Sequence, residues 1–305
     1  MTMKKFFALI TLYISCSAVA STQPLLIITH AYLRPDFIEI QHKTFKKFLK
    51  DPYEFVVFND ARDYEIRSQI KQLCKKLQLR CIEIPQEIHD RPYLQRYPYE
   101  DPNNACARCA NVVQYSLDVL GFQHDGLVAI IDSDMFLVQD FSIAEYMQNY
   151  DIAGVPQSRG NVLYLWNGLV FFNMNSLPNK KSINFNCGVI EGNPTDVGGH
   201  LYYYFKQNPD VRVSQMGVYH SQSFACNTCQ QKDVYTPCAH NTDHLRKQNI
   251  PETIIKFMQS GPPNIEFLLN NNFLHYRGGG NWDHKSQSYH DYKTKILLRF
   301  IDSII

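Results

Sequence analysis

Two aspartates, Asp132 and Asp134, follow directly after the apolar stretch "GLVAII" and precede a second apolar stretch, "MFLV". In an extended chain, residues two apart project to the same side, so both carboxylates can reach one site. Ionised carboxylates this close repel each other unless a cation compensates their charge. Carboxylate oxygens suit hard cations such as manganese or magnesium. The pattern therefore predicts a divalent metal site, although most acidic pairs of this kind are solvated turn residues.

A second candidate segment, "FLHYRGGGNWDHK", lies far along the chain and contains His275, Gly278, Gly279, Gly280 and Trp282. Consecutive glycines let a backbone approach a ligand closely and offer N–H groups to a phosphate. Imidazole is a good ligand for a borderline cation such as manganese. Alone, the segment fits a loop with a hydrogen-bonded histidine. Together with the two aspartates, it indicates a shared site for metal and phosphate.

The elements that must position these residues alternate between strands and helices. Apolar runs predict strands at residues 24–32, 53–60, 79–84 and 126–131. Helical periodicity predicts helices at residues 37–50, 65–78 and 105–121. This order is typical of an α/β fold with a mostly parallel sheet covered by helices. Such sheets bind ligands at the carboxyl ends of their strands, which is where the two aspartates lie.

The rest of the chain predicts further elements of both kinds. Helices are expected at residues 143–150, 198–208, 251–260 and 292–304. Strands are expected at residues 151–157, 163–175 and 211–216. Residues 85–103 are rich in proline and tyrosine and predict a long loop, which in a compact domain is functional or disordered. We expect one domain over residues 21–305, with a C-terminal helical segment.

The first twenty residues have the pattern of a signal peptide: two lysines, an apolar run and the small-residue site "AVA". Removing them leaves 28 basic residues against 29 acidic ones, a net charge of −1. No face of the chain is predicted to be strongly basic, which disfavours nucleic-acid binding. No later apolar run reaches the length of a membrane span. We therefore expect an exported protein, in a periplasm, a secretory lumen or the medium.

Eight cysteines remain after the predicted signal peptide, and an even number in an exported protein favours disulfides. The segment "CNTCQQKDVYTPCAH" also has spacing compatible with a structural zinc ion held by Cys226, Cys229, Cys238 and His240. The predicted export favours disulfides over zinc. In either case, residues 226–240 are expected to form a Cys-rich insertion in which disulfides or zinc crosslink a loop.

The strand and helix order, the D-x-D pattern, the aromatic "NGLVFFN" strand and the H-x-x-G-x-x-x-W pattern resemble the GT-A glycosyltransferases. The pattern is most similar to the family of glycogenin and bacterial lipopolysaccharide galactosyltransferases. The resemblance implies that Asp132, Asp134 and His275 bind manganese, which bridges the diphosphate of a nucleotide sugar. The acceptor would be a glycan, a protein or a lipid-linked sugar. That family often has a lysine two residues before its tryptophan. This chain has Gly280 there, so Arg277 or Lys285 would have to replace it.

The resemblance also suggests residues that contact the donor and acceptor. Asn59 and Asp60 end the second strand, where the nucleotide base lies in this fold. Arg108 is a candidate for contacting the sugar or the diphosphate, while Gly278, Gly279 and Trp282 would lie beside the diphosphate. Asn167 and Asp196 are candidates for contacting the transferred sugar or the acceptor. Read without the resemblance, Arg108 is a surface helix residue, and Asn167 and Asp196 are turn residues.

Two other functions remain open at this point. In a phosphohydrolase of the haloacid-dehalogenase type, Asp132 would be the nucleophile and Asp134 the general acid. That pattern needs threonine or valine two residues after the second aspartate, where this chain has Phe136, and it lies on the first strand. A secreted carbohydrate-binding protein without turnover is the other reading, and the 13% aromatic content suits stacking on sugars. Motifs of serine hydrolases, P-loops and dinucleotide-binding folds are absent from the sequence.

Overall fold

The computed structural model describes residues 23–90, 104–220, 246, 251–259, 266–268, 272–279 and 286–305. The predicted signal peptide and most of the proline- and tyrosine-rich loop lie outside the described residues. So do Gly280, Trp282 and Lys285 of the glycine-rich segment. The Cys-rich segment with Cys226, Cys229, Cys238 and His240 also lies outside them, and its predicted disulfides or zinc stay predictions.

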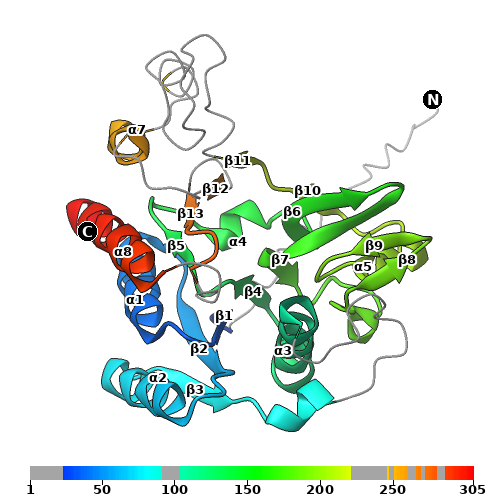
Figure 1. The fold of residues 1–305 in the computed structure, drawn as a ribbon. Helices are drawn as coiled ribbons and strands as arrows, with labels where there is room; N and C mark the ends of the chain where they lie inside the picture. The colour runs from blue at the N-terminus through cyan, green and yellow to red at the C-terminus, as the bar shows by residue number, and fades with distance from the viewer. Residues whose placement is uncertain are drawn as a thin grey trace, which may run out of the picture.

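A seven-stranded, mostly parallel sheet forms the centre of the fold (Figure 1). Its strands, in spatial order, are β10 (Val213–Gln215), β6 (Ile152–Arg159), β7 (Val162–Asn173), β4 (Leu127–Ile131), β1 (Leu25–Ala31), β2 (Tyr53–Asn59) and β3 (Arg80–Glu83). Only β7 runs against its neighbours β4 and β6. The four strands predicted from the first half of the chain are confirmed, and the predicted α/β fold class is confirmed with them.

Helices cover both faces of this sheet because its strands are apolar on both sides. In β1, Leu25 and Ile27 pack toward α1 (Pro35–Phe48) and α2 (Tyr64–Leu77). The alternate residues Leu26 and Ile28 pack toward α3 (Ala105–Val119) on the opposite face. Successive residues of a strand point to opposite faces, so one apolar run supplies two cores. Figure 1 shows the resulting three-layer arrangement.

A second, antiparallel sheet joins the middle of the chain to its later part. Its order is β11 (Val218–His220), β12 (Glu266–Leu268), β13 (Phe273–His275) and β5 (Met135–Leu137). Beside it, α7 (Glu252–Gln259) and α8 (Gln287–Ile304) pack with α1 around a third apolar cluster (Figure 1). The sheet pairs His275 with Met135, so a distant histidine is brought to the residue that follows the second aspartate.

Short elements complete the described part of the chain. They are α4 (Ile143–Tyr146), α5 (Leu201–Gln207), the β8 (Gly188–Ile190) and β9 (Asn193–Thr195) hairpin, and the 3-10 turns η1 (Gln86–Asp90), η2 (Gly121–Gln123) and η3 (Lys180–Ser182). The helix predicted at residues 143–150 is only one turn long. Ser142 caps its start, and its last residues form turns instead of a second helical turn.

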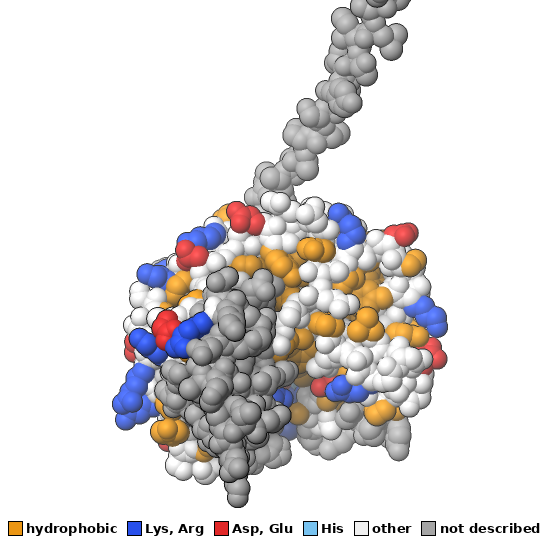
Figure 2. All heavy atoms as spheres, turned by 90° about the horizontal axis from the view of Figure 1, so that it is seen from above, with side chains coloured by type: hydrophobic (Ala, Val, Ile, Leu, Met, Phe, Trp, Pro, Cys, Tyr) orange, Lys and Arg blue, Asp and Glu red, His pale blue; other side chains and the backbone are white. Residues whose placement is uncertain are grey.

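Among the described residues, no helix combines the length and the apolarity needed to cross a membrane. Figure 2, which views the molecule from above Figure 1, shows hydrophobic and uncharged side chains across the middle of that face. Lysine, arginine, aspartate and glutamate side chains gather toward its margin (Figure 2). The described part of this face therefore has its charge at the edge and not in the centre.

Candidate active site

The two aspartates lie in the tight turn that joins β4 to β5. The Met135 N–H donates to the Asp132 carbonyl oxygen at 3.1 Å, which closes the turn. Gln41 of α1 is fully buried beneath it, and its amide nitrogen donates to the carbonyl oxygens of Asp132 and Met135 at 2.8 and 3.0 Å. The carboxylates therefore project from a clamped turn and not from an extended strand end.

Asp134 meets His275 of β13, as the sequence predicted for a shared site. The His275 Nε2 atom lies 3.5 Å from Asp134 Oδ1, and both residues are buried. The Gly279 N–H donates to the other carboxylate oxygen, Oδ2, at 3.0 Å. The Tyr276 N–H donates to the Asp134 carbonyl oxygen at 2.8 Å. The "LHYRGG" segment is thus wrapped around Asp134 by backbone and side-chain contacts.

Gly279 is required by this close approach. A Cβ atom added there would lie 2.6 Å from the Phe37 ring, 2.8 Å from the Tyr276 ring and 2.9 Å from Cβ of Asp134. These distances are too short for any other residue, so glycine lets the backbone reach the carboxylate. Gly278 precedes it in the left-handed region at φ 69°. The predicted binding of a diphosphate by these glycines stays a prediction.

The two carboxylates differ in their electrostatic surroundings. Burial and the neighbouring Asp134 raise the pKa of Asp132 to about 7, against the opposing effect of His275. Burial alone would raise the pKa of Asp134 too, but His275, the Gly279 N–H and Lys293 together hold it below its usual range. Asp134 is therefore held as the anion, while Asp132 keeps its proton to a higher pH because burial and the Asp134 charge outweigh the effect of His275.

Trp166 holds the other side of His275. The two ring centroids are 5.0 Å apart, with the planes tilted by 46°. The indole lies over Gly168, where an added Cβ atom would come within 2.1 Å of it. Pairing of β6 with β7 shifts between Gly154 and Val155 and skips from Val170 to Trp166. This irregularity re-aims the side chains of the skipped residues, among them Asn167.

Asn167 and Asp196 lie near the aspartate turn, and Cys109 of α3 connects them. The Asn167 amide nitrogen donates to the Cys109 sulfur at 3.3 Å. Burial raises the pKa of the Cys109 thiol well above its ordinary value, and the charges of Asp132, Asp196 and Asp60 raise it further. The charges of these three carboxylates therefore act on one thiol. Cys109 did not stand out in the sequence as part of the site, and its only sequence signal was its place on the helix before the aspartate strand.

Asp60 and Arg108 meet in a charge-balanced network at the end of β2. The Arg108 guanidinium donates to Asp60 Oδ2 at 2.7 Å, and His89 Nε2 lies 2.8 Å from Asp60 Oδ1. Asn59 is fully buried, and its amide bonds to the backbone of Ala61 and Arg67. The structure thus brings Asp60 and Arg108 together, while the Asn59 side chain holds the chain after β2. The predicted nucleotide contacts of these residues stay predictions.

Lys293 of α8 is a further charged residue near the aspartates. It is only 1% exposed, donates to the Arg277 carbonyl oxygen at 2.8 Å and lies 3.8 Å from the centre of the Tyr276 ring. Burial lowers the pKa of Lys293 to about 8, while Asp134 acts in the opposite direction. A lysine three and four residues before Ile296 and Leu297 lies on the apolar face of its helix, and this was the signal available in the sequence.

A divalent cation fits the donor types at the aspartate turn. Two carboxylates and an imidazole are suitable ligands for manganese or magnesium, and a cation would relieve the charge that raises the pKa of Asp132. Asp132, Asp134 and His275 are the residues that would hold it. Within the described ranges, no three histidine, cysteine, aspartate or glutamate side chains are already arranged as a metal-binding group.

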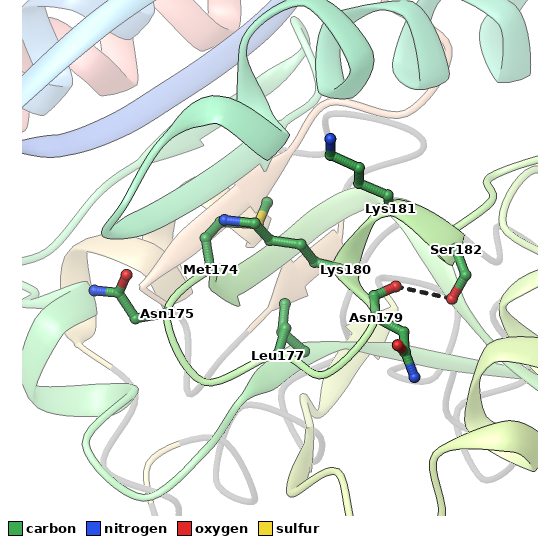
Figure 3. Close-up of a pocket in the computed structure, with 7 residues that line it drawn as sticks. All are labelled: Met174, Asn175, Leu177, Asn179, Lys180, Lys181 and Ser182. Carbon is green, nitrogen blue, oxygen red and sulfur yellow. Dashed lines mark hydrogen bonds between the residues drawn. The ribbon is translucent and has the colours of Figure 1, made fainter.

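A separate depression of about 780 Å³ lies elsewhere on the molecule (Figure 3). It is lined by the loop after β7, from Met174 to Ser182, where the Ser182 hydroxyl donates to the Asn179 carbonyl oxygen at 2.8 Å. β4 begins beside this loop, since Leu127 pairs with Asn173. The depression is therefore at the amino end of β4, while the aspartate turn is at its carboxyl end.

Comparison with known proteins gives structural similarity alone. No family model matches the chain, and no curated protein sequence matches it either. Solved glycosyltransferase structures are similar to it. The galactosyltransferase LgtC, in complex with donor and acceptor sugar analogues, aligns at 9% identity and a TM-score of 0.41, covering 92% of this chain and 96% of LgtC.

Two further structures align over a smaller part of the chain. The mannosyltransferase PcManGT from Pyrobaculum calidifontis, in complex with GDP-Man and Mn²⁺, is 13% identical with a TM-score of 0.41, covering 64% of this chain and 55% of its own. The bifunctional glycosyltransferase WbbM is 12% identical with a TM-score of 0.34, covering 53% of this chain and 33% of its own. The alignments thus span less than two thirds of either protein. With TM-scores below 0.5, the residues of the site alone carry the functional proposal.

Proposed function

We propose that this protein is a metal-dependent glycosyltransferase that moves a sugar from a nucleotide sugar to an acceptor hydroxyl. The observation that carries the proposal is the contact of Asp134 with His275 beside Asp132, in a turn at the carboxyl end of a central strand. Burial and the neighbouring Asp134 raise the pKa of Asp132 to about 7, so a second negative charge in this buried turn is not fully compensated by His275. A cation that also binds an anionic substrate would supply that compensation.

In the proposed reaction, the bound cation stabilises the negative charge on the departing diphosphate. The residues of the chain orient the reactants around it. Asp134 stays ionised because His275 and the Gly279 N–H stabilise its charge. Asp132 would hold the cation together with Asp134 and His275 as a carboxylate. Asn167 and Asp196 are proposed to contact the transferred sugar or the acceptor hydroxyl, and Arg108 is proposed to orient the donor while paired with Asp60.

The phosphohydrolase alternative is disfavoured by the state of Asp134. A general acid must carry a proton at working pH, with a pKa near that pH. His275, the Gly279 N–H and Lys293 instead hold the pKa of Asp134 below its usual range. A carboxylate stabilised as an anion is a good metal ligand and a poor proton donor. A non-catalytic carbohydrate-binding protein remains the second outcome of the experiment below.

The finer features of the function are also proposals. We propose transfer of a hexose from a UDP- or GDP-linked donor to a glycan, protein or lipid-linked acceptor. We propose export of the chain, on the evidence of the lysines, the apolar run and the "AVA" site at its start. The anomeric configuration of the glycoside product would show whether transfer retains or inverts the configuration of the donor sugar.

The test is an incubation of the protein with manganese and a panel of UDP- and GDP-sugars, with release of nucleoside diphosphate as the readout. We expect release that disappears with a chelator and falls strongly in Asp134→Asn. The matched control is Asp140→Asn, which changes an exposed aspartate and should behave as the unchanged protein. Release of phosphate from phosphate monoesters would favour the phosphohydrolase. Sugar binding without turnover of any donor would favour the binding protein.

A further inference from the structure

Two cysteines from separate parts of the chain meet next to the candidate active site. Cys106 lies in the first turn of α3, where Asn104 caps the helix and accepts the Cys106 N–H at 2.9 Å. Cys187 comes directly before β8 and is fully buried. Both are free thiols in the structure, and the neighbouring Cys187, burial and Asp196 hold the pKa of the Cys106 thiol above its usual range. Both side chains pack in the apolar cluster between α3 and the sheet.

The β8–β9 hairpin explains why they meet. Gly188 pairs with Thr195 at its open end, so Cys187 and Asp196 are the next residues outward on the two strands. The Cys106 thiol donates to Asp196 Oδ1 at 3.2 Å. This contact places the Cys106 thiol at the open end of the hairpin, where Cys187 also lies.

We propose that Cys106 and Cys187 form a disulfide that ties the first turn of α3 to the hairpin bearing Asp196. A disulfide needs side chains that approach each other closely and from compatible directions. The hairpin brings Cys187 opposite Asp196, the residue that the Cys106 thiol contacts. The predicted export would bring the chain into a compartment where such bonds persist. The bond itself is independent of the proposed catalytic function.

The bond forms by thiol–disulfide exchange with a small-molecule disulfide such as oxidised glutathione. Cys106 is the partly exposed member of the pair and reacts first. Its thiolate attacks one sulfur of oxidised glutathione, which leaves a mixed disulfide on Cys106 and releases one glutathione thiolate. The thiolate of Cys187 then attacks the Cys106 sulfur and releases the second. The cysteine pair loses two electrons and two protons, and the glutathione disulfide is reduced to two thiols.

The disulfide would change what Asp196 contacts. In the thiol form, Asp196 Oδ1 accepts from the Cys106 thiol as well as from the Val197 N–H at 2.8 Å. In the disulfide form, the thiol donor is lost and the Val197 N–H remains. Arg108 and Cys109, in the same stretch of α3, contact Asp60 and Asn167. The bond would thus fix the position of Arg108 and Cys109 relative to the hairpin that bears Asp196.

The deciding experiment is peptide mapping of the full chain produced through an oxidising secretory route, digested without reduction after alkylation. We expect a peptide pair linked through Cys106 and Cys187 in most molecules, which disappears after reduction. Alkylated Cys106 and Cys187 in most molecules would overturn the proposal. So would a link from Cys106 to Cys109 or to any other cysteine.

Two variants extend the test. Cys187→Ser should expose Cys106 to alkylation and lower the melting temperature by on the order of 5–10 °C relative to the oxidised parent, because the bond closes a long loop. The same comparison under reducing conditions should show a much smaller difference. Cys109→Ser is the matched control on the same helix and should keep the linked peptide. Loss of that peptide in Cys109→Ser, or an unchanged melting temperature in Cys187→Ser, would contradict the proposal. Should Cys187→Ser fail to fold, the map of the unchanged chain still decides.

Discussion

Asp60 and Asp132 occupy equivalent places in the central sheet and have opposite electrostatic surroundings. Each follows directly after a strand, β2 or β4, at the carboxyl edge of the sheet. Asp60 has a guanidinium at 2.7 Å and an imidazole at 2.8 Å. Asp132 has another carboxylate as its dominant charged neighbour, which helps to raise its pKa to about 7. The first charge is compensated within the protein, and we propose that a cation compensates the second.

This difference distinguishes a carboxylate that stabilises the fold from carboxylates that are proposed to bind a cation. A buried ion pair with satisfied hydrogen bonds loses much when one partner is removed. A pair of like charges costs stability until a cation binds, and the protein then recovers that cost as binding energy. The same residue type at the same edge of one sheet therefore predicts opposite effects of mutation. Neutralising Asp60 should destabilise the fold, and neutralising an aspartate of the turn should mainly impair binding and turnover.

The largest expected effect on stability is that of Asp60→Asn. It leaves the Arg108 guanidinium buried without a carboxylate, which should lower the free energy of unfolding by about 3–5 kcal/mol. Urea denaturation measures this change. Asp140→Asn is the control, since its ion pair with Lys50 is exposed on both sides and should contribute nothing measurable. Equal stability of Asp60→Asn and the parent would remove the distinction between the two regions.

Asp134→Asn should reduce kcat/KM by about 100-fold or more, since metal-assisted stabilisation of a leaving group supplies several kcal/mol to the transition state. The change removes a charge with little change of shape, and the amide oxygen can still accept the Gly279 N–H, so the variant should fold. The metal-free variant should melt somewhat lower than the parent, because His275 and Lys293 no longer face an anion. Steady-state kinetics at fixed manganese measures the loss. Parental activity in this variant would contradict a metal-binding role for Asp134.

His275→Ala should have a smaller effect of about tenfold, because both carboxylates remain and still attract the cation. Raising the manganese concentration should restore part of the activity by mass action. The double variant with Asp134→Asn should lose less than the sum of the two single effects in free energy, since both residues act through one ion. Strict additivity, or failure of manganese to restore any activity, would separate the two residues into independent roles.

The smallest expected effect is the pH dependence contributed by Asp132. A raised pKa means that the folded protein binds this proton more tightly than the unfolded chain. The stabilisation is complete below the ordinary pKa of 3.8 and is lost as the pH rises to about 7. Asp132→Asn removes this loss, so the metal-free variant should melt a few degrees higher than the parent at pH 8 and should lose this advantage at pH 4. Parallel melting curves for the two proteins across that range would show that Asp132 is not the group that titrates.

Much of the sheet could be predicted from the sequence because its strands are apolar on both faces. The run predicted at residues 24–32 contains β1, and the run at residues 53–60 contains β2. The three-residue strands of the second sheet and of the β8–β9 hairpin carry no such pattern. They are stabilised by pairing with distant residues, as Leu274 pairs with Phe136. No local property of the sequence specifies such a contact.

For the candidate site, the structure brings together Asp134 and His275, two residues that the sequence indicated, while their metal-binding role stays a prediction. Residue type and spacing indicated Asp132, Asp134 and His275, because a metal needs particular donor atoms. The compensation of Asp60 by Arg108 depends on how α3 packs against the end of β2, which no pattern shows. The place of Lys293 beneath the Tyr276 ring depends on how α8 packs against the glycine-rich segment. The sequence thus indicated the candidate metal ligands, and only the structure shows which charged residues surround them.

The proposed function depends on a site in which Asp132, Asp134 and His275 bind one divalent cation. Its most direct test is an electron paramagnetic resonance titration of manganese, in which protein-bound Mn²⁺ no longer contributes to the signal of the free ion. The protein should bind one Mn²⁺ per chain in the presence of UDP or GDP, and Asp134→Asn should bind it at least tenfold more weakly, while Asp140→Asn should match the parent. No binding with either nucleotide, or equal binding by Asp134→Asn and the parent, would contradict the shared-cation site.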